Sequence, residues 1–158
     1  MKKGIFFALG LSIGAVGAAV ITGNLSKKKI DEKDRKVDKF KQYYNVLIQW
    51  LELKQKGKKL DDFFVKNSIK TVAIYGMGEM GTRLYEELKN SNVEVKYAID
   101  KNADSTYSEL KVIETEDIRD DVDAIVVSAI FAFDEIREEL EKKVNCQILS
   151  LDDIVYSI

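Results

Sequence analysis

The amino-acid sequence predicts an α/β domain in which about five parallel strands form a sheet with helices on both faces. Short apolar runs rich in β-branched residues alternate with amphipathic segments from residue 70 onwards, a pattern typical of strand–helix–strand units. The run at residues 71–75 leads directly into a glycine-rich turn. A second run, residues 123–128, is almost wholly apolar, as expected of a strand buried on both faces.

The first strand and the turn after it carry the strongest motif of the chain. Residues 71–75 are followed by Gly-x-Gly-x-x-Gly, residues 82–89 are predicted to form a helix, and residues 93–99 alternate like a second strand that ends on Asp100. This order of strand, glycine turn, helix, strand and acid is the dinucleotide-binding fingerprint. The predicted site residues of the turn are Gly76, Met77, Gly78, Glu79, Met80 and Gly81.

Each part of this motif has an expected task. The first glycine permits a sharp turn, the second lets a pyrophosphate approach the backbone, and the third brings helix and strand together. The helix N-terminus offers free N–H groups and a positive dipole to phosphate. Asp100 is predicted to accept hydrogen bonds from a ribose diol, which favours NAD over NADP, and Lys101 beside it is also placed at the site. The competing interpretation is that the glycines serve packing alone and that Asp100 is a solvated turn residue.

The rest of the domain continues the alternation of elements. After a polar loop at 101–106, strands are predicted at 110–113, 123–128 and 146–149, with a helical turn at 116–118, a helix at 131–143 and a closing turn at 151–155. Right-handed crossovers between parallel strands then give the strand order 3-2-1-4-5. In that order a ligand lies where the first and fourth strands diverge, at their carboxyl ends. Ser128 is therefore predicted to face the glycine turn across a crevice.

Composition limits the chemistry of such a site. The 158 residues contain no histidine and one cysteine, Cys146, so histidine-based catalysis, an intrachain disulfide and a cysteine zinc cluster are excluded. No acid and base stand out as a pair, and we predict no catalytic residue and no metal. Tyr85 and Lys89 have the Tyr-x-x-x-Lys spacing of short-chain reductases, but they lie on the first helix and are interpreted as one of its faces. Glu86 and Glu87 are interpreted as solvated helix charges, and Cys146 as a buried small hydrophobe.

An uncharged apolar run, residues 5–22, lies near the N-terminus and is followed by Lys27, Lys28 and Lys29. About 18 to 20 apolar residues suffice to cross a bilayer core as a helix, so residues 1–26 are predicted to be a membrane anchor. A cleaved signal peptide is the alternative. The three lysines are predicted to meet anionic lipid on the cytoplasmic side. We therefore expect a single-pass protein of the cell membrane with its domain in the cytoplasm.

Charge is distributed unevenly, although the formal net charge is only −2. Residues 27–70 carry 14 Lys and Arg against 7 Asp and Glu, whereas residues 71–158 carry 9 against 20. Because the folded part is the acidic one, nucleic acid is not an expected partner. A homodimer is a further hypothesis, since Gly10 and Gly14 have the Gly-x-x-x-Gly spacing of packed membrane helices, although small residues are common in such helices.

Residues 27–69 are predicted to be a basic juxtamembrane segment, with a helix at 30–56 and a short second helix at 60–65. Apolar residues recur every three or four positions in the first helix, namely at Val37, Phe40, Tyr44, Leu47 and Leu51, with Tyr43, Ile48 and Trp50 widening the stripe. We expect this stripe to cap the sheet domain. Contact with the lipid interface and pairing with another copy of the chain are the alternatives.

Residues 70–155 resemble the Rossmann-like nucleotide-binding modules of bacterial polysaccharide biosynthesis, including the N-terminal domain of sugar acyltransferases of the sialic-acid type. The resemblance rests on residues 72–81, 97–102, 110–113 and 123–128. It implies a Rossmann-like, doubly wound domain over residues 70–158 that holds a nucleotide or nucleotide-sugar at Gly76, Gly78, Gly81 and Asp100. The acyltransferases carry a catalytic histidine on hexapeptide repeats. These 158 residues contain neither feature, so that activity does not carry over.

The sequence therefore predicts a membrane-anchored module that binds NAD or a nucleotide-sugar. We expect it to be an accessory or sensor in cell-envelope polysaccharide biosynthesis, without catalytic activity of its own. One alternative is a subunit of an oxidoreductase or sugar-modifying enzyme that a partner completes. The other is a scaffold whose ligand site is vestigial.

Overall fold

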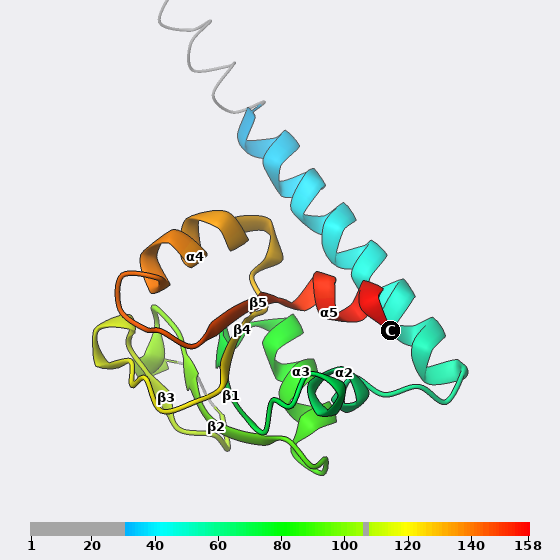
Figure 1. Cartoon of the computed structure of the whole chain (residues 1–158). Helices are drawn as coiled ribbons and strands as arrows, with labels where there is room; N and C mark the ends of the chain where they lie inside the picture. Colours follow the sequence, from blue (N-terminus) through cyan, green and yellow to red (C-terminus); the bar gives the residue numbers. More distant parts are fainter. Residues whose placement is uncertain (1–30, 106–107) are drawn as a thin grey trace, which may run out of the picture. The chain divides into compact units, whose positions relative to one another are not determined.

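The computed structural model describes residues 31–105 and 108–158 of the chain (Figure 1). The chain divides into two compact units, residues 1–41 and residues 42–158. The described part of the first unit, residues 31–41, is helical. The second unit contains the continuation of this helix to residue 55, the sheet and all other elements.

The second unit is built on a five-stranded, all-parallel sheet. Its strands are β1 (Thr71–Tyr75), β2 (Glu94–Ile99), β3 (Val112–Ile113), β4 (Ala124–Val127) and β5 (Gln147–Ser150). They lie in the order β3-β2-β1-β4-β5, which confirms the predicted topology. Tyr75 pairs with Ile99 on one side and with Val127 on the other, so the carboxyl ends of the three central strands are level. The turns after these strands therefore meet at one edge of the sheet.

Helices cover both faces of the sheet (Figure 1). One face packs against α2 (Asp61–Lys66), α3 (Glu79–Leu88) and α5 (Leu151–Ser157), which contribute buried Phe64, Leu84 and Ile154 to a single apolar core. The other face packs against α4 (Phe133–Leu140), whose Leu140 lies in a second core with Ile125. Because β1 and β4 are buried on both faces, they consist of nearly continuous apolar residues rather than alternating ones.

Several element bounds differ from those predicted. The first helix begins at Glu79 rather than at residue 82, because Gly78 is already its N-cap and Gly81 lies within it. The predicted helix at 131–143 is a 3-10 turn, Ile130–Ala132, followed by α4. The predicted closing turn at 151–155 is the helix α5, whose buried Leu151, Ile154 and Val155 give it an apolar face. Packing against the sheet thus supports a longer helix at the C-terminal end than its short sequence pattern indicated.

The predicted stripe of the N-terminal helix caps the sheet domain only at its edge, where Trp50 and Tyr43 pack on the apolar core. The prediction was wrong for the centre of the stripe, because Val37, Phe40, Tyr44, Leu47 and Leu51 are all exposed, at 41% to 72% of their surface. The residues that reach the apolar core are Val46, Trp50 and Leu53. These three residues have the same spacing of three and four as the predicted stripe, but they are displaced from its centre by one position along the sequence. Capping is therefore real, but a neighbouring face of the helix provides it.

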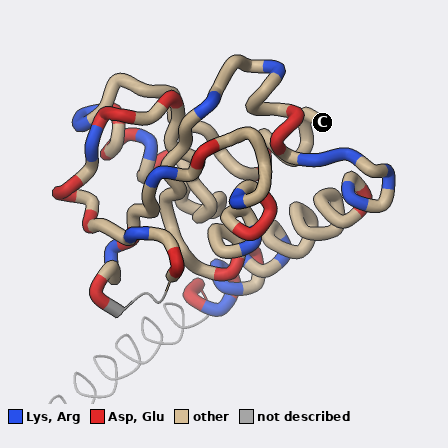
Figure 2. The backbone as a smooth tube through the Cα atoms, turned by 90° about the horizontal axis from the view of Figure 1, so that it is seen from below, with Lys and Arg blue, Asp and Glu red and all other residues tan. Residues whose placement is uncertain are grey.

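Lys and Arg positions and Asp and Glu positions alternate along most of the backbone of the second unit (Figure 2). Lys54, Lys56, Lys58 and Lys59 follow one another at the end of the N-terminal helix and in the turn after it. The Lys58 ammonium donates to the main-chain carbonyl of Ile158, so this basic turn holds the C-terminal residue.

The predicted anchor at residues 5–22, the lysines at 27–29 and the Gly10–Gly14 motif lie outside the described residues. Within residues 31–105 and 108–158, no helix is both long enough and apolar enough to cross a bilayer.

Candidate functional site

The glycine turn joins β1 to α3 at the carboxyl edge of the sheet (Figure 1). Gly76 follows β1 with a φ of +88°, a backbone conformation that residues with a side chain rarely adopt. Its N–H donates to the carbonyl of Ile99 at 2.8 Å, which extends the β1–β2 ladder by one bond. Gly78 then caps α3 in an extended conformation, with φ −69° and ψ −164°. The chain reverses over three residues, as the motif predicts.

Gly81 is required by close packing of helix and strand. A Cβ atom at this position would lie 1.9 Å from the carbonyl oxygen of Gly76 and 3.1 Å from the hydroxyl of Ser128. The first distance is far inside van der Waals contact with main-chain atoms, which cannot move aside cheaply. Gly76 and Gly81 are therefore explained by the fold itself, whatever else the turn does.

Gly78 has no such internal explanation. A Cβ atom built on it meets nothing within 4 Å, its φ is ordinary, and the residue is exposed. It stands where α3 begins, and no side chain among the described residues caps the first turn of that helix. The first N–H groups of a helix have no partner within it, and here they lie next to a position that lacks a side chain, which suits an anion on the helix dipole.

Asp100 is fixed against the glycine turn. One carboxylate oxygen accepts from the N–H of Met77 at 2.8 Å, and the other accepts from the N–H of Asn102 at 2.9 Å. The half-buried carboxylate keeps further lone pairs, so it remains able to accept a hydroxyl. The structure therefore brings the acid after β2 to the turn, and it gives the acid a structural task that the sequence did not reveal.

Ser128 does not face the turn across a crevice but lies in contact with it. Its buried hydroxyl donates to the carbonyl of Gly76 at 2.6 Å, and its N–H donates to the carbonyl of Tyr75. The hydroxyl satisfies a carbonyl that the turn leaves without a ladder partner. Ser128 is thus a support of the turn, since its one proton is already donated to the protein.

The other predicted site residues are divided between surface and core. Glu79 and Lys101 are exposed, at the start of α3 and after β2. Met77 and Met80 are buried in the core beneath α3, so their side chains point away from any ligand. The main-chain N–H of Met77 is already donated to Asp100, so these two residues take part in the site through the backbone and not through their side chains.

A crevice of about 390 Å³ opens beside the turn, on the α4 side of the sheet. It is lined by Tyr75, Gly76, Asp100, Lys101, Ala129, Phe131, Ala132, Glu135, Ile136 and Glu139. Its volume lies within the range of small-molecule sites. Three of these residues are acids and only one is basic, although Lys143 approaches Glu139 to 3.8 Å. The crevice therefore combines an apolar wall with an acidic rim.

The N-terminal helix reaches the border of this crevice. The ring of Tyr43 meets the ring of Phe131 edge-on, with centroids 6.0 Å apart. Burial raises the pKa of Tyr43, and the charge of Glu79 at the start of α3 raises it further. Tyr43 therefore links the helix, the crevice and the glycine turn.

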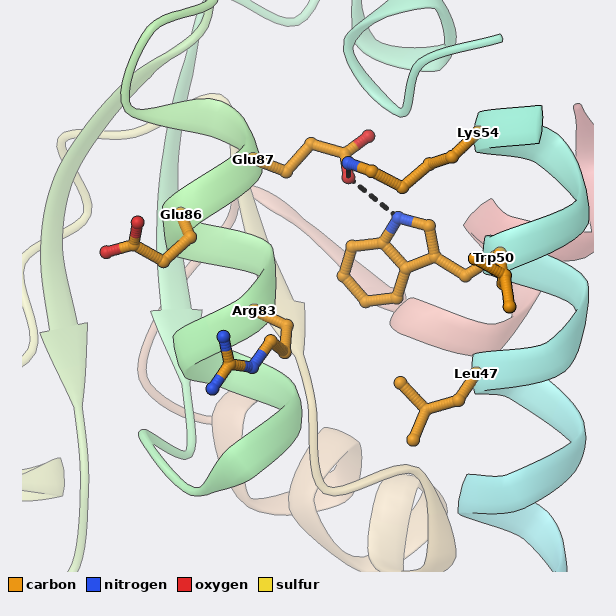
Figure 3. Close-up of a pocket in the computed structure, with 7 residues that line it drawn as sticks. Leu47, Trp50, Lys54, Arg83, Glu86 and Glu87 are labelled. Atoms are coloured by element: carbon orange, nitrogen blue, oxygen red, sulfur yellow. Dashed lines mark hydrogen bonds and ion pairs between the residues drawn. The ribbon is translucent and has the colours of Figure 1, made fainter. Parts of the chain in front are cut away.

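A second structural centre, Glu87, was missed by the sequence prediction that treated it as a solvated helix charge. Its carboxylate accepts from the Trp50 indole N–H at 2.8 Å and from the Lys54 ammonium at 2.6 Å (Figure 3). It also accepts from the main-chain N–H of Leu60 at 3.1 Å. The side chain is only 10% exposed. A buried tryptophan signals that some acceptor exists, but sequence spacing does not identify it, because Trp50 and Glu87 are 37 residues apart.

Three further reactive side chains, those of Cys146, Tyr97 and Lys89, have raised pKa values. Burial raises the pKa of the Cys146 thiol to about 11 and that of Tyr97 to about 12, so both stay protonated and unreactive at neutral pH. Lys89 is hydrogen-bonded to Glu86, which raises its pKa, as expected for a helix-face pair. Among the residues the structure describes, no group of three His, Cys, Asp or Glu side chains is arranged to hold a metal ion.

The fold and the turn define a five-stranded parallel α/β domain with a glycine-rich strand-to-helix connection and an acid after the second strand. The chain belongs to the family described as C2185-like, N-terminal, whose model matches residues 68–148. This match runs from just before β1 into β5 and includes the whole glycine turn and Asp100. No curated protein and no solved structure matches the chain.

Proposed function

We propose that this protein is a membrane-anchored, cytoplasmic module that binds NAD or a nucleotide-sugar at the glycine turn. It acts as an accessory or sensor in cell-envelope polysaccharide biosynthesis, without catalysis of its own. The Rossmann-like resemblance of residues 70–155 and the apolar run at 5–22 support this proposal from the sequence. The resemblance to the sialic-acid type acyltransferases supplies the nucleotide-sugar and the pathway.

Gly78 is the observation that carries the proposal. The fold explains Gly76 by its positive φ and Gly81 by its contact with the Gly76 carbonyl, whereas nothing within 4 Å explains Gly78. A position that is open, exposed and next to the uncapped end of α3 has reason to lack a side chain if a phosphate must approach the backbone there. The hydrogen bond from Met77 that holds Asp100 beside the same turn supports the proposal that this carboxylate accepts the ribose hydroxyls.

A scaffold without ligand is the competing function, and one observation favours it. The Asp100 carboxylate already accepts from Met77, and the Ser128 hydroxyl already donates to Gly76. The Asp100 carboxylate and the Ser128 hydroxyl therefore have partners within the protein without any ligand. Under this alternative Gly78 is a position where any residue is tolerated.

Thermal unfolding of the full chain with millimolar NAD, NADP, UDP-glucose or coenzyme A tests the proposal. A ligand at one hundred times its Kd adds about 2.7 kcal/mol to the free energy of unfolding, which raises Tm by several degrees. We expect NAD or UDP-glucose to raise Tm and the Gly78→Leu variant to lose this response. No response to any of the four compounds would contradict the proposal and favour the scaffold.

Two glycine variants provide the matched controls. Gly78→Leu should leave the Tm of the ligand-free protein nearly unchanged, because its side chain extends into open space. Gly81→Ala should lower it strongly, since its Cβ collides with the Gly76 carbonyl. If Gly78→Leu unfolds the protein, the loss of binding carries no information, and Gly78→Ala becomes the informative variant.

A further inference from the structure

The N-terminal helix carries a group of exposed apolar side chains in its part within the second unit. We call this group the exposed stripe, and its members are Tyr44, Leu47, Ile48 and Leu51. Tyr44 exposes 65% of its surface and Leu51 exposes 51%. The other exposed large apolar side chains described in this unit are single residues on α2, on the 3-10 turn before α4 and on α5. Single exposed apolar residues are normal, whereas a continuous group marks an interaction surface.

The spacing of the exposed stripe is that of a coiled-coil seam. From residue 37 to residue 51, apolar residues occupy every a and d position of a heptad repeat, namely Val37, Phe40, Tyr44, Leu47 and Leu51. The next d position is Lys54, whose ammonium is bound by Glu87, so the seam ends there. Side chains at a and d positions pack between those of a second helix that carries the same repeat.

The helix holds the exposed stripe away from its own domain. Its opposite face is fixed by Val46, Trp50 and Leu53, which are buried in the apolar core. The Trp50 indole is also hydrogen-bonded to Glu87 of α3. The exposed stripe therefore cannot rotate into its own core, and only a partner outside the unit can cover it.

A groove of about 360 Å³ lies beside the exposed stripe, between the N-terminal helix and α3 (Figure 3). Leu47, Trp50 and Leu51 line it on the helix, and Arg83 and Glu86 line it on α3. A ridge with a hollow at its side is complementary to the same surface related by a twofold axis, because each ridge then fills the hollow of the other copy. The shape therefore favours a second copy of the chain.

The charges beside the exposed stripe do not favour an anionic lipid surface. Lys54 is paired with Glu87 at 2.6 Å, and Lys56 is paired with Glu52 at 3.3 Å. Helices that lie in a lipid interface rely instead on Lys and Arg side chains that are available to the lipid headgroups. Positive charge beside this stripe is thus largely compensated within the protein.

The residues that flank the seam allow two copies to meet. In a parallel pair the e and g positions of the two helices face each other, and like charges there oppose pairing. In the second unit these positions are all uncharged, namely Tyr43, Ile48, Trp50 and Gln55. Two copies therefore approach without repulsion along this part of the helix.

We propose that the exposed stripe binds the same stripe of a second copy, so that two N-terminal helices form a short parallel coiled coil. The parallel direction rests on the proposed membrane anchor, because two copies in one bilayer enter it with the same orientation. Four half-exposed side chains of roughly 200 Å² present about 400 Å², less than the roughly 800 Å² per partner of a stable soluble complex. Anchoring in one membrane raises the effective concentration and compensates for this small area.

Single cysteines test the pair in the full chain, reconstituted in phosphatidylcholine vesicles and made in a Cys146→Ala background. A parallel pair brings each seam residue next to the same residue of the second copy, within reach of a disulfide. Tyr44→Cys and Leu51→Cys should therefore both form covalent dimers on mild oxidation. Asn45→Cys is the matched control, because Asn45 is exposed but lies off the seam, and it should stay monomeric. Equal cross-linking at all three positions, or at none, would overturn the proposal.

A charge in the seam tests whether the exposed stripe itself holds the pair. Leu47→Glu, added to Tyr44→Cys, buries two carboxylates in the seam and should reduce cross-linking about tenfold. Leu47→Met should leave cross-linking unchanged. Because Leu47 is exposed and lies outside the apolar core, the Tm of Leu47→Glu should equal that of wild type. Unchanged cross-linking with Leu47→Glu would contradict the seam.

Salt and dilution distinguish a second copy from the lipid interface. The heptad places Lys36 opposite Lys41 of the second copy, so salt should screen this repulsion and preserve or increase cross-linking. A higher ratio of lipid to protein should lower cross-linking, because pairing needs two chains. A polarity-sensitive dye on Leu47→Cys that reports an apolar environment at every ratio, without cross-linking at Tyr44→Cys, would place the stripe in lipid and overturn the proposal.

The outcomes separate this inference from the proposed function. Cross-linking at the seam in a protein that responds to neither NAD nor UDP-glucose supports the pair and contradicts only the nucleotide site. If the full chain does not enter vesicles, the anchor is wrong, and the same cysteine variants decide the pairing in concentrated solution.

Discussion

At the scale of single residues, Glu87 shows how much of this fold depends on one side chain. Its two carboxylate oxygens receive an indole, an ammonium and a main-chain N–H from Trp50, Lys54 and Leu60. These donors come from the end of the N-terminal helix and from the residue before α2, while Glu87 itself is on α3. One carboxylate thus joins three segments that cover the same face of the sheet.

Replacing Glu87 should therefore destabilise the protein substantially. Glu87→Ala leaves the buried Trp50 indole and the Leu60 N–H without acceptors, and we expect the free energy of unfolding to fall by about 2 to 3 kcal/mol. Glu86→Ala is the matched control, because Glu86 is the exposed neighbour and forms an exposed helix-face ion pair with Lys89. Urea unfolding followed by tryptophan fluorescence measures both. Equal, small effects of the two variants would contradict the role of Glu87.

The three glycines of the turn also show how much depends on single residues, here through steric contacts. The motif assigns the first and third glycines to the turn and to helix–strand packing and the second to a ligand, and in the structure the fold requires Gly76 and Gly81 but does not require Gly78. This separation turns a general motif into a specific hypothesis about one position. It also identifies which substitutions report on ligand binding rather than on folding.

At the scale of elements, Asp123 connects the beginnings of β1 and β4. Its carboxylate accepts from the N–H groups of Lys70 and Thr71, each at 2.8 Å, and from the Thr71 hydroxyl at 3.0 Å. These hydrogen bonds lower the pKa of Asp123. The amino edge of the two central strands is thus held by one acid, just as Ser128 holds their carboxyl edge.

This arrangement predicts a pH dependence of stability. A carboxyl whose pKa is lower in the folded state stabilises the protein above its unfolded pKa of about 3.9, and this contribution disappears as the pH falls through the folded pKa. Wild type should therefore have a higher Tm than Asp123→Asn at pH 7, and the difference should shrink below about pH 4. The exposed Asp104→Asn is the control and should show no comparable change in difference. A difference that is constant from pH 7 to pH 3 would contradict the assignment.

The elements also show what the sequence predicts well and what it does not. The strand order was predictable because the alternation of apolar runs and helices leaves few topologies once crossovers are right-handed. The first residue of α3 was not predictable, because Gly78 and Gly81 resemble turn residues, whereas the helix starts between them at Glu79. The face of the N-terminal helix was predicted only in part: Trp50 belongs to the predicted stripe, but Val46 and Leu53 do not. Two neighbouring stripes have the same spacing, and only tertiary packing selects between them.

The candidate site was predictable in its position but not in its internal bonding. The motif placed the turn and Asp100 together because parallel strands end at one edge. It did not show that Asp100 binds Met77 or that Ser128 binds Gly76, because these bonds depend on side-chain orientation. The acidic crevice was also missed, since Glu135 and Glu139 reach it from α4, more than 30 residues along the chain from Asp100.

At the scale of the whole molecule, the N-terminal helix presents two different surfaces. Val46, Trp50 and Leu53 pack on the sheet domain, whereas Tyr44, Leu47, Ile48 and Leu51 are exposed. Pairing with another copy is our proposal for the exposed stripe, and contact with the lipid interface is the alternative. The stripe does not contribute to the core, so substitutions there should affect association and not folding.

The proposed membrane anchor is tested most directly with a charge in the centre of the apolar run. Val16→Arg places a guanidinium within residues 5–22, which costs about 2.5 to 3.5 kcal/mol at the middle of a membrane helix. We expect the wild-type full chain to sediment with membranes and to resist alkaline carbonate extraction, and Val16→Arg to be released. Val16→Leu is the control and should behave like wild type. Release of the wild type by high salt alone would mean that Lys27, Lys28 and Lys29 hold the protein on charged lipid without a membrane span. A measured mass that lacks about 20 N-terminal residues would instead identify a cleaved signal peptide.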